Sequence, residues 1–252
     1  MPTASSNDLD TLVRRVDEDR WLASRFAPAD VRARLIALYA VNYEIAHIGE
    51  TVREPGLAEI RSHWWREAID EIFEGRSPRP HPALLALERA VDAAPLSAAH
   101  FHQILDARRL DLEALPFKSE TDLADYIDGT AGALMRLALE ASGIVDGSAP
   151  VESFVRTAGF RWALTGMLRS EPIWRARGRT LLPAGVRSAF ATLKAGAESS
   201  RQFAGSLPTA AFPALGYVAL VPAYLGHDKI RASVPLLERQ VRLIFASATG
   251  RY

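Results

Sequence analysis

The chain has 252 residues, of which 48% are hydrophobic and 24% charged, a composition typical of a folded protein with a sizeable core. Its 30 basic and 30 acidic side chains balance, which gives no electrostatic reason to expect nucleic acid or an anionic membrane as the main partner. The absence of cysteine excludes disulfides, thiolate nucleophiles and cysteine-held zinc or iron–sulfur sites.

The first residues, MPTASSNDLDTLVRRVDEDRW, lack the apolar core of a secretory signal. The longest apolar stretch, Ala210 to Gly226, contains Pro213 and Pro222 and falls short of the roughly 20 apolar residues that a membrane-spanning helix needs. We therefore expect a cytoplasmic protein without a transmembrane segment, with residues 1–10 flexible.

Helical periodicity dominates, and the alternating pattern of strands is nearly absent. Apolar residues at three- and four-residue spacing predict a helix with Pro28 in its first turn that runs through Ala46. Further helices are predicted, in chain order, over 57–73, 82–93, 97–115, 122–141, 151–171, 184–207, 212–225 and 234–247. Gly75 and Pro116 should end the helices before them, and Pro172 should end or kink the one over 151–171. The prediction is one all-α domain over 1–252.

Gly129 and Gly132 interrupt the helix predicted over 122–141. They flank Thr130 and Ala131, so small residues gather on one face of this helix. That face is expected to pack closely against another helix or a ligand.

One candidate metal-binding set is Glu44, His47 and Glu50, whose i,i+3 spacing places the side chains on one helix face. Glu-x-x-His is the pair used in helical di-iron bundles, but that use needs a second pair on a facing helix, and the sequence has none. A second set, Glu59, His63 and Glu67, has i,i+4 spacing that an exposed ion-paired face explains equally well. We therefore predict no metal site.

Four arginines follow the apolar helix over 151–171: Arg169, Arg175, Arg177 and Arg179. Arginine suits bidentate binding of phosphate or carboxylate, and favourable positive charge at a helix C-terminus is the alternative reading. Trp64 and Trp65 should point about 100° apart on their helix, one into the core and the other to an interface or rim. No nucleophile elbow, phosphate-binding glycine loop or dinucleotide fingerprint occurs.

Several segments, taken in order, resemble the squalene/phytoene synthase family over roughly residues 15–250. They are WLASRFAP at 21–28, YAV at 39–41, Asp111-Leu112, YIDGTAG at 126–132, GMLRSEPIW at 166–174 and GRTLLP at 178–183. The resemblance implies an all-α, isoprenoid-synthase-like helical bundle around a central cavity. In that family two Asp-rich motifs bind magnesium-bridged diphosphates, and an apolar channel holds the prenyl chains.

The chain departs from the family at the metal motifs. The aspartates of the first motif, DDxxD, fall on Ala46, His47 and Glu50. In the second motif the asparagine falls on Gly166, and the aspartates fall on Ser170 and Trp174, while Arg169, Arg179 and Pro183 are kept. Only Glu50 retains a carboxylate. Because magnesium prefers carboxylate and water oxygens, we predict that magnesium-dependent prenyl condensation is lost and that no cofactor is bound.

The run NYEIAHIGETVREPGLAEIRSHWWREAIDEIFEG, at 42–75, resembles a divergent branch of the family. That branch includes the mitochondrial complex I assembly factor of this fold and its alphaproteobacterial relatives. The matching residues are Asn42 and Glu44, Thr51–Glu54, and Ile60-Arg61 with Trp64-Trp65. This resemblance implies a protein partner in respiratory complex I assembly and, as an alternative to a free cytoplasmic protein, attachment at the periphery of the inner membrane.

Three hypotheses remain open. The first is a non-condensing protein that aids complex I assembly. The second is a working prenyl transferase whose magnesium is held by substitute ligands, Glu44, Glu50, Asp106 and Asp111. The third is a non-catalytic binder of an isoprenoid or lipid. The candidate cavity residues are Tyr43, Glu44, Asp106, Asp111, Gly129, Gly132, Trp162, Gly166, Arg169 and Arg179. A channel filled by Trp162, Trp174 and other large side chains would argue against the third.

Overall fold

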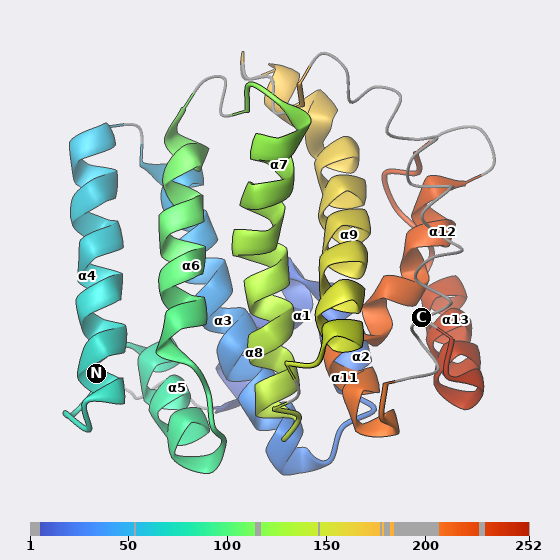
Figure 1. The fold of residues 1–252 in the computed structure, drawn as a ribbon, viewed down its shortest axis with the longest axis horizontal. Coiled ribbons are helices and arrows are strands. Elements are labelled where there is room, and N and C mark those ends of the chain that lie inside the picture. Colours follow the sequence, from blue (N-terminus) through green and yellow to red (C-terminus); the bar gives the residue numbers. More distant parts are fainter. Residues whose placement is uncertain are drawn as a thin grey trace.

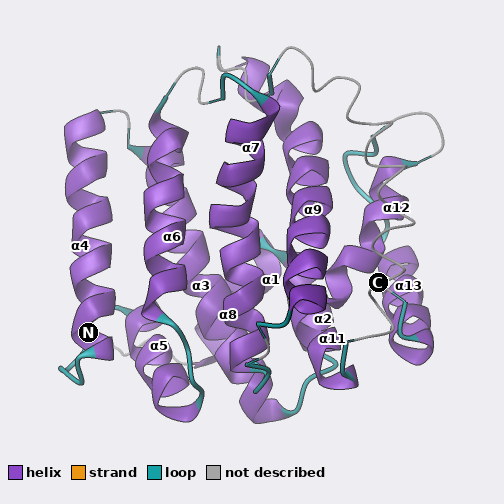
Figure 2. Ribbon diagram, in the orientation of Figure 1, coloured by secondary structure: helices purple, strands orange, loops and turns teal. Residues whose placement is uncertain are grey.

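The computed structural model describes residues 6–52, 54–113, 117–145, 147–176, 178, 182–183, 207–226 and 230–251. Its longer helices are α1 Ser6–Val16, α2 Glu18–Ser24, α3 Ala29–Thr51, α4 Pro55–Phe73, α5 Pro82–Ala93, α6 Ala98–Arg108, α7 Glu120–Ile127, α8 Ala133–Ala141, α9 Ala149–Ala176 and α13 Leu236–Thr249. Shorter pieces are the 3-10 helices η1 Arg109–Leu112, η4 Thr209–Ala211 and η5 Gly216–Leu220, the π-helix η2 Asp128–Gly132, and α11 Phe212–Leu215 and α12 Val221–Leu225. The described ranges contain no strand (Figure 2), which confirms the all-α prediction.

Helix α3 is the centre of the bundle. It packs against α1, α4, α5, α6 and α8. In Figure 1, α4, α6, the α7–α8 run and α9 stand side by side in front of it. Seven consecutive residues, from Leu35 to Val41, are buried, which is the pattern of a helix surrounded by other helices rather than of a surface helix.

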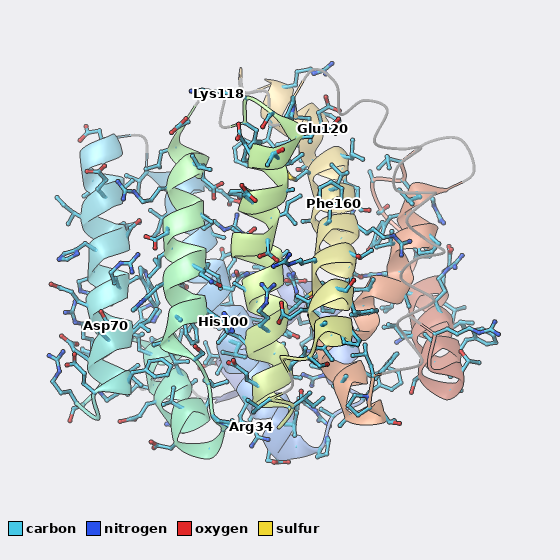
Figure 3. The ribbon with its side chains drawn as sticks, in the orientation of Figure 1. Arg34, Asp70, His100, Lys118, Glu120 and Phe160 are labelled. Carbon is cyan, nitrogen blue, oxygen red and sulfur yellow. The ribbon has the colours of Figure 1, made fainter. Side chains whose placement is uncertain are left out.

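Polar contacts join neighbouring helices of the front row. Figure 3 labels Asp70 on α4 and His100 on α6. The Asp70 carboxylate lies 2.7 Å from Nε2 of His102 on α6. His100 lies 3.3 Å from the carboxylate of Glu140 on α8, and this carboxylate raises the pKa of His100. Helices α4, α6 and α8 are therefore linked by charged groups as well as by packing.

The two ends of the chain meet in a buried charge cluster. Arg239 of α13 donates from Nη1 to Asp19 of α2 at 2.8 Å and from Nη2 to Glu18. The hydroxyl of Tyr224 donates to the other oxygen of Asp19 at 2.6 Å. Asp19 and Arg239 are both buried, so this cluster fixes α2 against α12 and α13.

Most predicted helices are confirmed, with differences at their ends. The helix over 82–93 has the predicted bounds, and Gly75 follows α4 with a left-handed φ of 74°. Pro28 is the N-cap of α3 rather than a member of its first turn. Helix α6 tightens into η1 at Arg109 instead of continuing to residue 115. Helix α9 passes through Pro172 to Ala176, so the predicted ending there is wrong.

The continuous helix predicted over 212–225 is wrong. Three short pieces replace it, with Pro213 and Pro222 each in the first turn of an α-helical piece. Proline lacks an N–H group and cannot continue a ladder of i→i−4 hydrogen bonds, so each proline restarts the helix. The helix predicted over 184–207 lies outside the described residues apart from Leu207.

The run over 122–141 is helical throughout but contains the π-turn η2 at the two glycines. A Cβ on Gly129 would lie 2.9 Å from the Cβ of Ala107 on α6. A Cβ on Gly159 of α9 would lie 3.5 Å from the Gly132 nitrogen. The close helix packing predicted for this small-residue face is confirmed on both sides.

Exposure separates the two adjacent tryptophans of α4, as their spacing predicts. Trp65 is 5% exposed and belongs to the core, whereas Trp64 is 36% exposed. No helix in the described part of the chain is long and apolar enough to cross a membrane.

Candidate functional site

A cavity of about 290 Å³ lies between α3, η1, the α7–η2–α8 run and α9. Its polar lining is Arg20, Asn42, Glu50, Arg108, Asp111, Tyr126, Thr130 and Ser170. Its apolar lining includes Phe117, Leu134, Trp162, Met167 and Trp174. The site is therefore an apolar space with a small number of charged groups in its wall, which is the usual make-up of a small-molecule pocket.

A hydrogen-bonded triad forms one wall. Tyr126 donates its hydroxyl to Asp111 Oδ1 at 2.6 Å. Nη1 of Arg108 donates to Asp111 Oδ2 at 3.2 Å and to the Tyr126 hydroxyl oxygen at 2.9 Å. Burial raises the pKa of Tyr126, so its phenol stays neutral. A Cβ on Gly49 would lie 2.8 Å from the Asp111 Cβ, so only glycine lets α3 approach η1 this closely.

Arg20 is a second cationic group in the cavity lining. It is 8% exposed, and its Nη1 lies 2.5 Å from Asp17 Oδ2. Its guanidinium carbon is 4.8 Å from the Tyr217 ring centroid and 5.8 Å from that of Trp162. Burial disfavours its charged form, but Asp17 and the surrounding tyrosines more than offset this, and the pKa of Arg20 is raised. Arg20 is therefore a fixed positive charge inside the bundle.

The positions of the former metal motifs lie mostly at this cavity. Ala46, Glu50, Gly166, Ser170 and Trp174 line it. Ala46 and Gly166 have no side-chain atom that could bind a metal ion. The only polar group of the Trp174 side chain is an N–H, which donates hydrogen bonds and offers no lone pair to a metal. Ser170 donates its hydroxyl to the Met167 carbonyl at 3.1 Å. Glu50 is thus the single carboxylate left among these positions, and this donor set does not fit magnesium.

His47 turns away from the cavity. Its Nδ1 lies 3.1 Å from Glu50, and its ring stacks on Tyr43 with centroids 5.2 Å apart. His63 and Glu67 form a similar pair on α4 at 3.1 Å, with exposed side chains. No group of three or more His, Asp or Glu side chains in the described ranges is placed to hold a metal ion.

The remaining predicted residues divide between the cavity and its surroundings. Trp162 and Asp111 line the cavity, whereas Tyr43 and Glu44 do not. Asp106 pairs with Arg66 of α4 and does not line it either. Of the four substitute ligands considered for magnesium, the structure brings only Glu50 and Asp111 to the cavity.

Two of the predicted glycines and two of the predicted arginines serve packing or ion pairing instead. Gly129 and Gly132 lie at the helix contacts described above. Arg169 donates from Nε and Nη2 to the Ala232 carbonyl at 3.2 and 3.0 Å, and its guanidinium carbon lies 3.8 Å from the Tyr224 ring centroid. Arg175 pairs with Glu171 at 2.6 Å on an exposed turn of α9. Arg177 and Arg179 lie outside the described residues.

Sequence reasoning missed Arg20 and Arg108 as cavity residues. The i,i+3 spacing of Arg108 to Asp111 is a local signal that could have found one of them. Arg20 has no such signal, because the polar stretch around it has the composition of a surface segment. Tyr126 was noted only as part of a motif, and its bond to Asp111 gives it a place in the cavity wall.

Comparisons with known proteins agree with this geometry. The family model for squalene/phytoene synthase matches residues 13–248. Complex I assembly factor 6 of NADH dehydrogenase (ubiquinone) from Bos taurus is 29% identical over 172 residues, which cover 68% of this chain and 51% of that protein. A phytoene synthase from Mycobacterium tuberculosis is 25% identical over 176 residues, covering 69% and 56%. The chain thus spans about half the length of the curated relatives it matches.

The fold has a close counterpart among solved structures. A squalene synthase from Alicyclobacillus acidocaldarius superimposes with a TM-score of 0.71 at 18% identity, covering 97% of this chain and 94% of that one. The match of the family model over most of the sequence, on a bundle of the same architecture, shows that the chain belongs to the squalene/phytoene synthase family.

Proposed function

We propose that this protein does not condense prenyl diphosphates and instead supports the assembly of respiratory complex I. The first half rests on the donor set at the former metal motifs. Condensation begins with loss of pyrophosphate, whose charge magnesium stabilises in this family. With Ala46, Gly166 and Trp174 in the cavity wall, the side-chain oxygen ligand of the family motif is missing at one position on α3 and at two positions on α9.

The second half is supported by the relatives. The assembly factor matches the chain at 29% identity, against 25% for the phytoene synthase, over a similar length. The run over 42–75, which resembles the assembly-factor branch, forms the second half of α3 and all of α4. It therefore includes the helix that carries Asn42, Ala46 and Glu50 to the cavity.

A direct assay tests the loss of condensation. Purified protein is incubated with farnesyl or geranylgeranyl diphosphate and magnesium, beside an active synthase of the family as positive control. We expect no squalene, dehydrosqualene or phytoene. Product formed over repeated turnovers would contradict the proposal.

A genetic assay tests the assembly role. The gene is deleted in the source organism, and NADH:ubiquinone oxidoreductase activity is measured with succinate dehydrogenase activity as control. We expect loss of the first activity and not of the second, with rescue by the wild-type gene. Glu50→Gln should rescue as well, because its side chain is half exposed and no metal role is assigned to it. Unchanged complex I activity after deletion would remove the assembly role.

A further inference from the structure

The two cavity arginines have hydrogen-bonding capacity that the described residues leave unused. All bonds given for Arg108 leave through Nη1. Its Nε is buried and has no hydrogen-bond partner among the described residues, and the same holds for Nε of Arg20. A buried donor without an acceptor is costly, and hydrogen bonds to charged groups are the stronger ones. Both arginines also line the cavity, so an anion there would lie beside their guanidinium groups.

The arginines also act on one another. Burial lowers the pKa of Arg108 most, and the positive charge of Arg20 adds a smaller lowering, although nearby Tyr126 and Asp111 leave that pKa raised overall. Two like charges close together in a low-dielectric interior repel, and an anion placed between them would relieve this. The geometric observation is that two arginines, both with an Nε unpaired within the described residues, line one cavity, and the repulsion between their charges favours the same kind of ligand.

The carboxylates of the site do not fill this role. Asp111 accepts from Tyr126 with one oxygen and from Arg108 with the other, so donors already surround it. Asp17 pairs with Arg20 through Nη1. Glu50 also lines the cavity, but its side chain is 49% exposed and pairs with His47. The site thus offers an incoming anion two guanidinium groups, each paired through Nη1 with one carboxylate, beside the half-exposed carboxylate of Glu50.

The rest of the cavity sets the size and character of the ligand. A volume of about 290 Å³ is at the lower limit of small-molecule pockets and corresponds to roughly ten water-sized groups. Phe117, Leu134 and Trp162 supply apolar and aromatic walls. A compact body matches this volume better than a pair of long prenyl chains does.

We infer that the cavity binds a compact organic anion, carrying one phosphate or carboxylate group held by Arg108 and Arg20 without a metal ion, with an apolar or aromatic body against Trp162. The inferred anion site does not depend on the proposed assembly role, and separate measurements test it.

The test uses phenyl phosphate and benzoate as probes, with neutral benzamide as the matched control ligand. Binding is followed by calorimetry without magnesium and by tryptophan fluorescence, since Trp162 and Trp174 line the cavity. We expect at least one anion to bind with a Kd below about 10 mM and benzamide not to bind. The two anions distinguish a phosphate site from a carboxylate site, and either result supports the inference.

Variants locate the site. Arg108→Gln should weaken binding about ten- to a hundredfold. Arg109→Gln, at the neighbouring exposed arginine, should leave binding unchanged. Gly166→Leu keeps both charges but fills the cavity, since a Cβ there has nothing within 4 Å, and it should abolish binding. Circular dichroism and the melting temperature establish that each variant is folded. If Arg108→Gln does not fold, the folded Gly166→Leu variant still tests the inference.

Four results would overturn the inference: no binding of either anion, equal binding of benzamide, equal weakening by Arg109→Gln, or unchanged binding by folded Gly166→Leu. Tight binding of farnesyl phosphate with no binding of phenyl phosphate would overturn the size limit and with it the inference.

Discussion

The buried contact between the two ends of the chain gives the sharpest stability prediction. Asp19→Ala removes the acceptor shared by Arg239 and Tyr224, whose bonds to Asp19 are 2.8 and 2.6 Å long. The Asp19 and Arg239 side chains are only 8% and 11% exposed. Removing one member of a buried pair costs about 3–5 kcal/mol, because the other charge is left uncompensated. Glu18 still pairs with Arg239, which places the expected loss near the lower value, at about 3 kcal/mol.

Urea and thermal unfolding measure this loss. For a chain of this size each kcal/mol shifts the melting temperature by about 2–4 °C, so Asp19→Ala should melt roughly 6–12 °C below the wild type. Glu238→Ala is the matched control on α13, since it breaks ion pairs that are about one-third exposed or more, with Arg231 and Arg242. Glu238→Ala should lower the free energy of unfolding by no more than about 1 kcal/mol.

A double-mutant cycle isolates the pair itself. If the charge left on Arg239 causes the loss, Arg239→Met should recover part of the stability in the Asp19→Ala background. The reasoning is refuted if Asp19→Ala costs no more than Glu238→Ala, or if the two substitutions add without coupling.

Two further predictions concern the helix contacts. Gly129→Ala should destabilise the fold by about 1–3 kcal/mol in urea unfolding, because its Cβ would lie 2.9 Å from that of Ala107. Gly56→Ala, where no atom lies within 4 Å, should be neutral or stabilising, and equal losses would contradict the packing argument. Glu140 raises the pKa of His100. The stability from this pair should be complete below about pH 6.5 and lost as pH rises through the raised folded-state pKa, so Glu140→Gln should cost more at low pH than at high pH; an equal cost throughout would refute the pairing.

The sequence predicts the long helices because their periodicity is local. Helix α5 has the predicted bounds, with proline at its start, and α4 ends just before the predicted glycine. Local rules fail where tertiary contacts decide. Pro172 lies within α9, and the stretch over 212–225 is divided among short helical pieces that pack on α2, α8, α9 and α13. A proline in the sequence predicts that the helix is disturbed at that position. Whether the helix ends, restarts or continues there depends on the elements that pack against it.

The residues of the candidate site likewise include some that the sequence predicts and some that it does not. Alignment of motifs predicts Ala46, His47, Glu50, Gly166, Ser170 and Trp174, and all of them except His47 line the cavity. Arg20 and Arg108 could not be paired from sequence, because 88 positions separate them and only the packing of α2 and α6 around α3 brings both to the cavity. The two positively charged residues of the site are therefore identified only by the structure, whereas the carboxylates Glu50 and Asp111 are predicted from the sequence.

The lining also shows how the cavity stays open without the metal ligands. The cavity-lining residues on α3, η2 and α9 include several small ones: Ala46, Gly49, Ala131, Ala163 and Gly166. Interiors are close-packed, and a leucine at Gly166 would fill part of this space and gain buried apolar area. Small residues on three elements leave the cavity unfilled, and Arg20 and Arg108 place positive charges in its lining. On our inference, a cavity with this lining suits an anion that guanidinium groups hold directly better than a metal-bridged diphosphate.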